Sequence, residues 1–191
     1  THASGGRVYR STDGGSTWTR IDGISTLGLY RFNRVDAGVT VNGWAGAVYL
    51  SRDDGLTWTA TQVCDNPLYA TEYLGNGIAL QASEKGVVYR GTRNGEEWHE
   101  AGIPGGAADD FASLGEGVVL YCTYTGARNM YLSTDYGLTW DNLGTTGTVK
   151  DDNLDHVIAF PRGDEIVVVG GTLRGFILRT TLPAAAVKKA R

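Results

Sequence analysis

The sequence predicts an all-β protein: a β-propeller of short four-stranded antiparallel blades, with about four to five blades in this chain. Four of the five tryptophans recur at intervals of about forty residues, the length of one propeller blade. The composition agrees, because 28 glycines and only four prolines among 191 residues are typical of many short strands joined by tight turns. Both observations favour a repeat architecture in a single domain.

One motif marks the repeat. Its clearest copy is the segment Ser11-Thr12-Asp13-Gly14-Gly15-Ser16-Thr17-Trp18, which returns at residues 51–58 and 133–140. Residues 91–98 keep its frame but carry Arg93 at the Asp position, where Asn94-Gly95 is itself a hairpin signal. We call these four segments the repeat hairpins. The motif's chemistry suggests that the Asp accepts turn N–H groups, the Gly supplies a positive φ and the Trp packs inward. The residues expected in these roles are Asp13, Gly15, Trp18, Asp53, Gly55, Trp58, Asp135, Gly137 and Trp140.

This motif resembles the Asp box of the sialidase-like (BNR repeat) β-propellers, and the resemblance covers nearly the whole chain from Arg7 to Thr180. It implies that each hairpin joins the third and fourth strands of a blade at the rim, away from any ligand site. The repeat hairpins are therefore expected to be folding devices.

The strand patterns place one propeller domain at residues 1–183 and a tail or linker, too short for a stable helix, at 184–191. Its modules lie near residues 7–22, 27–63, 69–103, 110–143 and 157–180, with two, four, four, four and three strands. We expect residues 7–11 to join the fifth module in one blade and close the ring, since each set alone leaves an open edge. The alternative is that this chain forms part of a larger ring or is one protomer of an assembly.

Charge and motifs exclude several function classes. The net charge of −4, without a run of basic residues, predicts no nucleic-acid partner. No apolar run approaches the roughly 20 residues that span a bilayer, so no membrane partner is predicted. Cys64 and Cys122 lack metal-ligand spacing and are expected to be buried thiols, and residues 151–156 lack the pattern of a calcium loop. We predict neither a metal nor any other cofactor.

Functional side chains are expected on the innermost strands and their loops, which converge on the propeller axis. The candidate ligand-binding residues are Tyr30, Arg31, Trp44, Tyr73, Tyr124 and Arg128, with Tyr69 as a further aromatic nearby. Aromatic rings stack on sugars, and a guanidinium suits a carboxylate. Tyr30-Arg31 is similar to the first two positions of the sialidase Tyr/Phe-Arg-Ile-Pro motif, whose Arg clamps the substrate carboxylate, but Asn33 departs from it.

The prediction is a non-catalytic recognition module that binds glycan or protein at its axial face, with no catalytic residue. One alternative is a sialidase-like exo-glycosidase, which would need Asp36 as acid and Tyr121 or Tyr124 with Glu116 as the nucleophile pair. Another is a structural or adhesion component of a larger assembly, such as a phage fibre or capsid appendage, with a homo-oligomer as one form. These readings place the chain in an extracellular or virion-associated setting.

Overall fold

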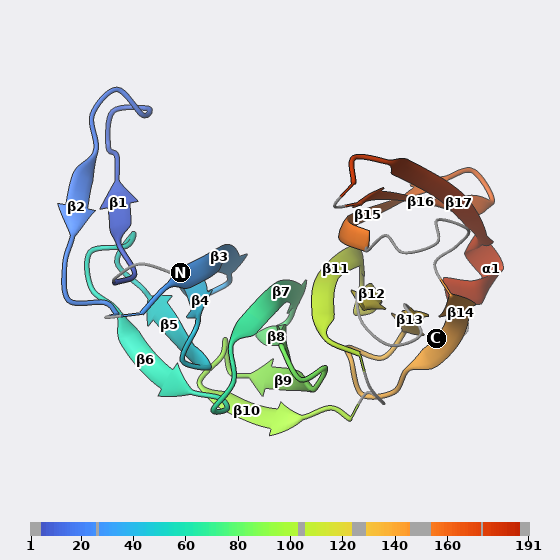
Figure 1. The fold of residues 1–191 in the computed structure, drawn as a ribbon, viewed down its shortest axis with the longest axis horizontal. Helices are drawn as coiled ribbons and strands as arrows, with labels where there is room; N and C mark the ends of the chain where they lie inside the picture. The colour runs from blue at the N-terminus through green and yellow to red at the C-terminus, as the bar shows by residue number, and fades with distance from the viewer. Residues whose placement is uncertain are drawn as a thin grey trace.

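The structure, a computed structural model, describes residues 5–25, 27–102, 106–123, 129–145, 154–172 and 174–187. Its strands form five separate antiparallel sheets, which we call blades 1 to 5. Figure 1 shows them side by side along an arc, with the first strand of each of blades 2 to 5 on the concave side. The predicted all-β propeller architecture, with about five blades, is confirmed.

The strand bounds follow the predicted modules closely. Blade 1 holds β1 (Val8–Arg10) and β2 (Thr19–Ile21), and blade 2 holds β3 (Leu29–Val35), β4 (Gly38–Gly43), β5 (Ala47–Ser51) and β6 (Thr59–Gln62). Blade 3 contains β7 (Leu68–Gly75), β8 (Ile78–Ser83), β9 (Val88–Thr92) and β10 (Glu97–Glu100). Blade 4 contains β11 (Ala108–Gly115), β12 (Val118–Thr123), β13 (Asn129–Ser133) and β14 (Asp141–Thr145). Blade 5 has β15 (Leu154–Arg162), β16 (Glu165–Thr172) and β17 (Ile177–Pro183).

The expected tail begins instead with one helical turn, α1 (Ala184–Val187). Ala184 N–H donates to the Asp164 carbonyl (2.8 Å), and Val187 packs against the core between blades 4 and 5. These contacts hold a turn that would not be stable alone. This is the only helix in the described part of the chain, and it is too short to cross a lipid bilayer.

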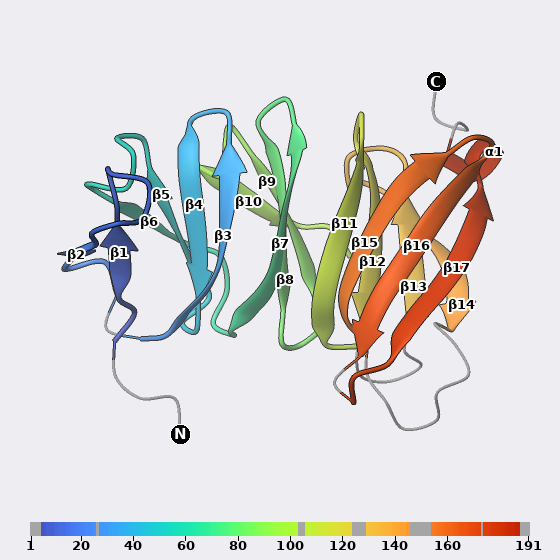
Figure 2. The same ribbon diagram turned by 90° about the horizontal axis from the view of Figure 1, so that it is seen from above.

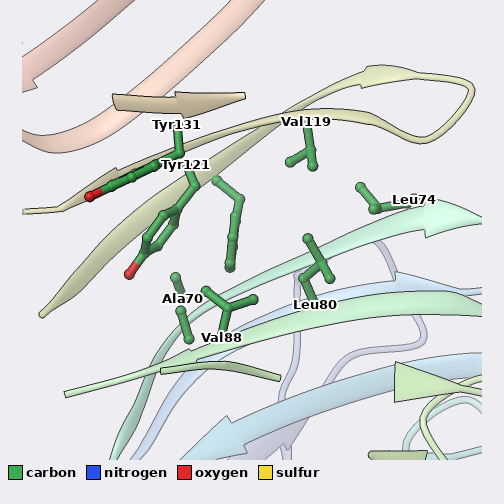
Figure 3. Packing of buried hydrophobic residues seen from close by; sticks show 9 residues of the cluster. Ala70, Leu74, Leu80, Val88, Val119, Tyr121 and Tyr131 are labelled. Atoms are coloured by element: carbon green, nitrogen blue, oxygen red, sulfur yellow. The ribbon is translucent and has the colours of Figure 1, made fainter. Parts of the chain in front are cut away.

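The core lies between neighbouring blades. Between blades 3 and 4, Leu80, Val88, Val119 and Tyr121 are fully buried, and Figure 3 shows them facing one another across the two sheets. Burial of each large side chain contributes roughly 2 kcal/mol or more, so blade-to-blade packing is the main stabilising term. A second cluster joins blades 4 and 5, and a smaller one joins blades 2 and 3.

Each blade has two ends with different contents. Consecutive strands of a blade run in opposite directions, so all odd-numbered strands begin at the same end, which we call the start face. The β4–β5, β8–β9 and β16–β17 turns also lie at the start face. The opposite end, the hairpin face, carries the turns between first and second strands and the repeat hairpins. In Figure 2 the β3–β4, β7–β8 and β11–β12 turns lie along the upper edge.

The expected closure of the ring is wrong for the described chain. Blade 1 is a sheet of β1 and β2 alone, and no strand of blade 5 pairs with it. The reason is positional: β17 already occupies the edge of β16 that β1 would need, through seven paired residues from Gly171↔Ile177 to Glu165↔Pro183.

Candidate ligand-binding face

Three aromatic side chains gather at the start face of blades 2 and 3. Tyr30 lies near the beginning of β3, Tyr69 near the beginning of β7, and Trp44 in the β4–β5 turn. The ring of Tyr30 is 6.2 Å from that of Trp44, tilted by 33°, and 5.1 Å from that of Tyr69 in an edge-on contact. All three are half-buried, so they offer apolar surface that is already ordered.

The local backbone explains why Trp44 sits there. Its N–H donates to the Gly28 carbonyl (2.9 Å), which ties the turn to the segment entering β3. Gly46 closes the turn at a φ of 72°, and a Cβ there would lie 2.1 Å from the Cys64 carbonyl oxygen. Burial raises the pKa of Tyr30 well above its ordinary value, with Tyr69 and Glu84 adding to the effect, so the phenol stays neutral.

A charged network adjoins these aromatics and connects three blades. Arg31 of β3 forms an ion pair with Asp110 of β11, and its second Nη lies 3.2 Å from His156 Nδ1 of β15. Asp110 Oδ2 accepts the N–H of Val157 (3.1 Å) and lies 3.5 Å from His156 Nδ1. Arg31 therefore bridges the concave side from blade 2 to blades 4 and 5.

Buried amides extend this network. The N–H of Arg31 donates to Asn42 Oδ1 (2.9 Å), Asn42 Nδ2 donates to Gln81 Oε1 (2.9 Å), and Gln81 Nε2 donates to Thr71 Oγ1 (2.8 Å). Asn42 and Gln81 are buried, so unpaired amides there would carry a desolvation cost. This series of hydrogen bonds fixes the relative position of β3 and β7, and therefore of Tyr30 and Tyr69.

Two carboxyl groups near the axis titrate abnormally. Burial raises the pKa of Glu72 to about 7, and repulsion from Asp110 adds to this. Burial likewise raises the pKa of Asp109 to about 8, reinforced by the carboxylates of Asp155 and Asp110 and opposed by Arg31. Within the described ranges, no group of three or more His, Cys, Asp and Glu side chains is placed to hold a metal ion.

The candidate ligand residues divide into three groups. Tyr30 and Trp44 lie together as described, and Arg31 lies beside them with its guanidinium paired to Asp110. Tyr73 does not join them: it is four residues beyond Tyr69, about 13 Å along β7 at strand rise, and its hydroxyl accepts the N–H of Gly77 (2.8 Å) at the hairpin face. Tyr124 and Arg128 lie outside the described residues.

The residues named for a sialidase mechanism are not brought together. Tyr121 is fully buried between blades 3 and 4, where its ring contacts Phe111 at 4.9 Å. Glu116 and Asp36 lie in turns at the hairpin face of blades 4 and 2, at the opposite end from Arg31. Tyr121, Glu116 and Asp36 therefore cannot act as nucleophile, base and acid around Arg31.

The network contains residues that the sequence analysis missed. Asp110 and His156 had no motif around them, yet they follow a positional rule. Tyr30, Tyr69, Asp109 and Asp155 are each the second residue of an inner strand, and Arg31, Asp110 and His156 are each the third. The rule depends on the observed starts of the inner strands, such as Leu154 for β15, which the apolar pattern of the sequence does not mark.

The repeat hairpins lie at the hairpin face. Asp13 Oδ1 accepts the N–H of Thr17 (2.9 Å), while Ser11 Oγ accepts that of Gly15 (2.8 Å). Hydrogen bonds from the side chain and backbone of Thr17 hold the pKa of Asp13 at about 2. The same bonds recur around Asp53 and Asp135, and Gly15, Gly55 and Gly137 have φ values of 92°, 85° and 78°. The side chains therefore cap turns.

The tryptophans of these hairpins differ in burial. Trp58 and Trp140 are half-buried, and Trp140 packs against Phe111 and Tyr121. The expectation that each indole packs inward is wrong for Trp18, which is 62% exposed. Among the described residues its blade consists of β1 and β2, so no inner strand of that sheet covers the ring. Its Nε1–H still donates to the Gly15 carbonyl (3.0 Å).

A cavity of about 280 Å³ opens between blades 4 and 5 at the hairpin face. Its walls are mainly apolar and include Leu114, Val118 and Ile166, with Ala184 and Val187 of α1 at one side. It lies at the opposite end of the blades from the aromatic group and is separate from the start-face site.

The comparisons with known proteins identify the fold. Neither the protein-family models nor the curated proteins gave a match. Among solved structures, the chain is similar to YCF48 from Cyanidioschyzon merolae, with 18% identity and a TM-score of 0.59 over 81% of this chain and 53% of that one. It is also similar to a structure described as YCF48 bound to D1 peptide, with 16% identity and a TM-score of 0.61 over 90% of this chain and 60% of that one.

The computationally designed Ika4 protein matches with 14% identity and a TM-score of 0.60, over 85% of this chain and 95% of that one. This chain thus spans a little over half the length of the two YCF48 chains and nearly all of the designed one. At these identities the similarity shows the β-propeller fold alone.

Proposed function

We propose that this chain is a non-catalytic recognition module that binds an extended segment of another protein at its start face. The observation that carries the proposal is the aromatic group of Tyr30, Trp44 and Tyr69, held in place by the buried hydrogen bonds of Asn42 and Gln81. Half-buried aromatics on a rigid scaffold lose little conformational entropy when a ligand contacts them, which favours binding.

Two further points support a protein ligand. A chain of the same fold carries a peptide in the structure described as YCF48 bound to D1 peptide. In addition, the guanidinium of Arg31 is engaged by Asp110 within the chain, so ligand recognition rests on the aromatic surface rather than on a carboxylate clamp. A glycan is the second candidate, because the tilted rings of Tyr30 and Trp44 offer the kind of surface on which the C–H face of a sugar stacks.

The resemblance of the repeat hairpins to the Asp boxes of sialidase-like propellers remains part of this proposal. It is supported by the recurring capping of Thr17, Thr57 and Thr139 N–H groups by the preceding Asp. An extracellular or virion-associated setting, and participation in a larger assembly, are proposed with it.

The test is selection of binders from a displayed library of linear peptides, with a glycan array run in parallel. Selected ligands are titrated against the wild type, Trp44→Ala and the matched control Trp18→Ala, which removes an exposed indole from the hairpin face. We expect Trp44→Ala to weaken binding at least tenfold and Trp18→Ala to leave it unchanged. Circular dichroism checks that both variants fold. Equal sensitivity to the two substitutions would contradict a binding site at the start face.

A further inference from the structure

The outer edge of β17 has no pairing strand in the described part of the chain. In blades 2, 3 and 4 the third strand pairs with a fourth, as β5 with β6, β9 with β10 and β13 with β14. β17 is the third strand of blade 5, and in the described part of the chain it pairs with β16 alone. A fourth strand of blade 5 would therefore pair with the other edge of β17.

The register shows which backbone groups point outward. The Phe176 carbonyl accepts the N–H of Thr172 (3.0 Å), so Phe176 faces β16, and the direction alternates along an antiparallel ladder. Leu178, Thr180 and Leu182 accordingly face β16, while Ile177, Arg179 and Thr181 direct their N–H and C=O groups away. Pro183 falls at the next outward position, where its missing N–H breaks no bond to β16.

The side chains at this edge specify a partner. Ile177 is 80% exposed, and Arg179 is exposed without an acidic partner among the described residues. Both lie on the face of blade 5 that is turned away from blade 4, next to Val169, which pairs with Arg179, and Ile158, which pairs with Val169. Directly opposite residues on antiparallel strands interact, so a carboxylate suits the position facing Arg179 and an apolar side chain the position facing Ile177.

We propose that the outer edge of β17 binds an extended segment of a partner protein as the fourth strand of blade 5, with an acidic residue opposite Arg179 and an apolar residue opposite Ile177. The backbone groups of Ile177, Arg179 and Thr181 supply the ladder, and the side chains supply the selectivity. Pairing of β17 with β17 of a second copy fits less well. Arg179 is the middle one of the three outward residues, so two-fold pairing centred on this triplet places it opposite its own copy, where like charges repel.

This site is distinct from the start face, and the two are tested separately. The probe is a fluorescent seven-residue peptide, Thr-Val-Thr-Glu-Thr-Val-Thr, capped at both ends; when Glu lies opposite Arg179, a Val lies opposite Ile177. Its binding is measured by anisotropy. The control peptides carry Lys in place of Glu, or N-methyl groups on alternate amides. The protein variants are Arg179→Glu and, as a matched control on the same sheet face, Arg162→Glu.

The wild type is expected to bind the Glu peptide at least tenfold more tightly than either control peptide. Arg179→Glu should reverse the preference in favour of the Lys peptide, and Arg162→Glu and Trp44→Ala should leave it unchanged. Amide exchange should slow at Ile177, Arg179 and Thr181 on binding, whereas Leu178 and Thr180 are already protected by β16.

Binding that is insensitive to N-methylation or to Arg179→Glu would overturn the proposal. A dimer of the unliganded protein with slow exchange at Ile177, Arg179 and Thr181 would overturn it as well, because it would assign the edge to a second copy.

Discussion

Removal of the Arg31 side chain should destabilise the whole arc. In Arg31→Ala, Asp110 keeps the N–H of Val157 and the neighbouring His156 but loses its guanidinium, at a site where its side chain is only 11% exposed. Breaking a fully buried ion pair costs about 3–5 kcal/mol. Because the Arg31 side chain is 29% exposed, water screens part of the loss, and we expect about 2 kcal/mol.

The assay is thermal unfolding of Arg31→Ala beside Arg162→Ala. Arg162 pairs with Glu165 (3.2 Å) at the surface, with side chains 60% and 47% exposed, so its loss should cost less than about 0.5 kcal/mol. For a chain of this size about 2 kcal/mol lowers the melting temperature by roughly 4–8 °C. A double-mutant cycle with Arg31→Met and Asp110→Asn should give a coupling energy of about 1–2 kcal/mol.

Amide exchange locates the effect. Because Arg31 connects β3 with β11 and β15, its loss should speed exchange at the starts of these strands more than in β9 or β13. If Arg31→Ala melts within the error of Arg162→Ala, the bridge across the concave side contributes no stability and the reasoning is refuted.

Three other perturbations test the fold. Since the folded protein holds the Glu72 proton up to about pH 7 while the unfolded chain releases it near 4.5, Glu72 should lower the free energy of unfolding by about 3 kcal/mol as pH rises through that window. In denaturant titrations from pH 4 to 8, Glu72→Gln should reduce the total fall by about this amount and leave the further fall that the raised pKa of Asp109 contributes; a fall as large as that of the wild type would exclude Glu72 as a source. Burial opposes ionisation of Asp135, but hydrogen bonds from Thr139 and Ser133 lower its pKa. Asp135→Ala should therefore lower the free energy of unfolding by about 1 kcal/mol at pH 7, and by less as pH falls below 4. Peptide binding at the start face should not change. In chemical denaturation Gly46→Ala should lower the free energy of unfolding by at least about 2 kcal/mol, because the added Cβ meets the Cys64 carbonyl. Gly23 has open space around it, so Gly23→Ala should cost only about 1 kcal/mol for its positive φ. Equal losses would contradict this reasoning.

The sequence was sufficient for the strands because each carries its own signal. The module expected near residues 27–63 contains β5 at Ala47–Ser51, where buried and half-buried positions lie between clear turns. The fifth module was expected to begin near residue 157, but its first strand, β15, spans Leu154–Arg162. The apolar pattern stops at Phe160, yet the ladder continues through Pro161↔Ile166 and Arg162↔Glu165 to a tight turn. Strand pairing therefore extends beyond the apolar residues.

The site was only partly predictable because it depends on which end of a strand a side chain occupies. Tyr69 and Tyr73 share one face of β7, since alternation places every second residue on the same side. That alternation does not separate the start face, where Tyr69 meets Tyr30, from the hairpin face, where Tyr73 meets Gly77. The partner of Arg31 is 79 residues away in sequence and becomes apparent only when the inner strands are placed side by side.

The failed prediction of ring closure has a similar cause, because it counted strands without assigning their positions in a blade. β1 leads into a repeat hairpin, which makes it a third strand, and β17 is also the third strand of its blade. Two third strands cannot occupy one edge. For β1 to join blade 5, β17 would have to leave β16 and lose seven paired residues, while β1 in its own hairpin pairs only three. The paired length therefore favours the separate sheets that are observed, and it leaves the outer edge of β17 as the place where a further strand can be added.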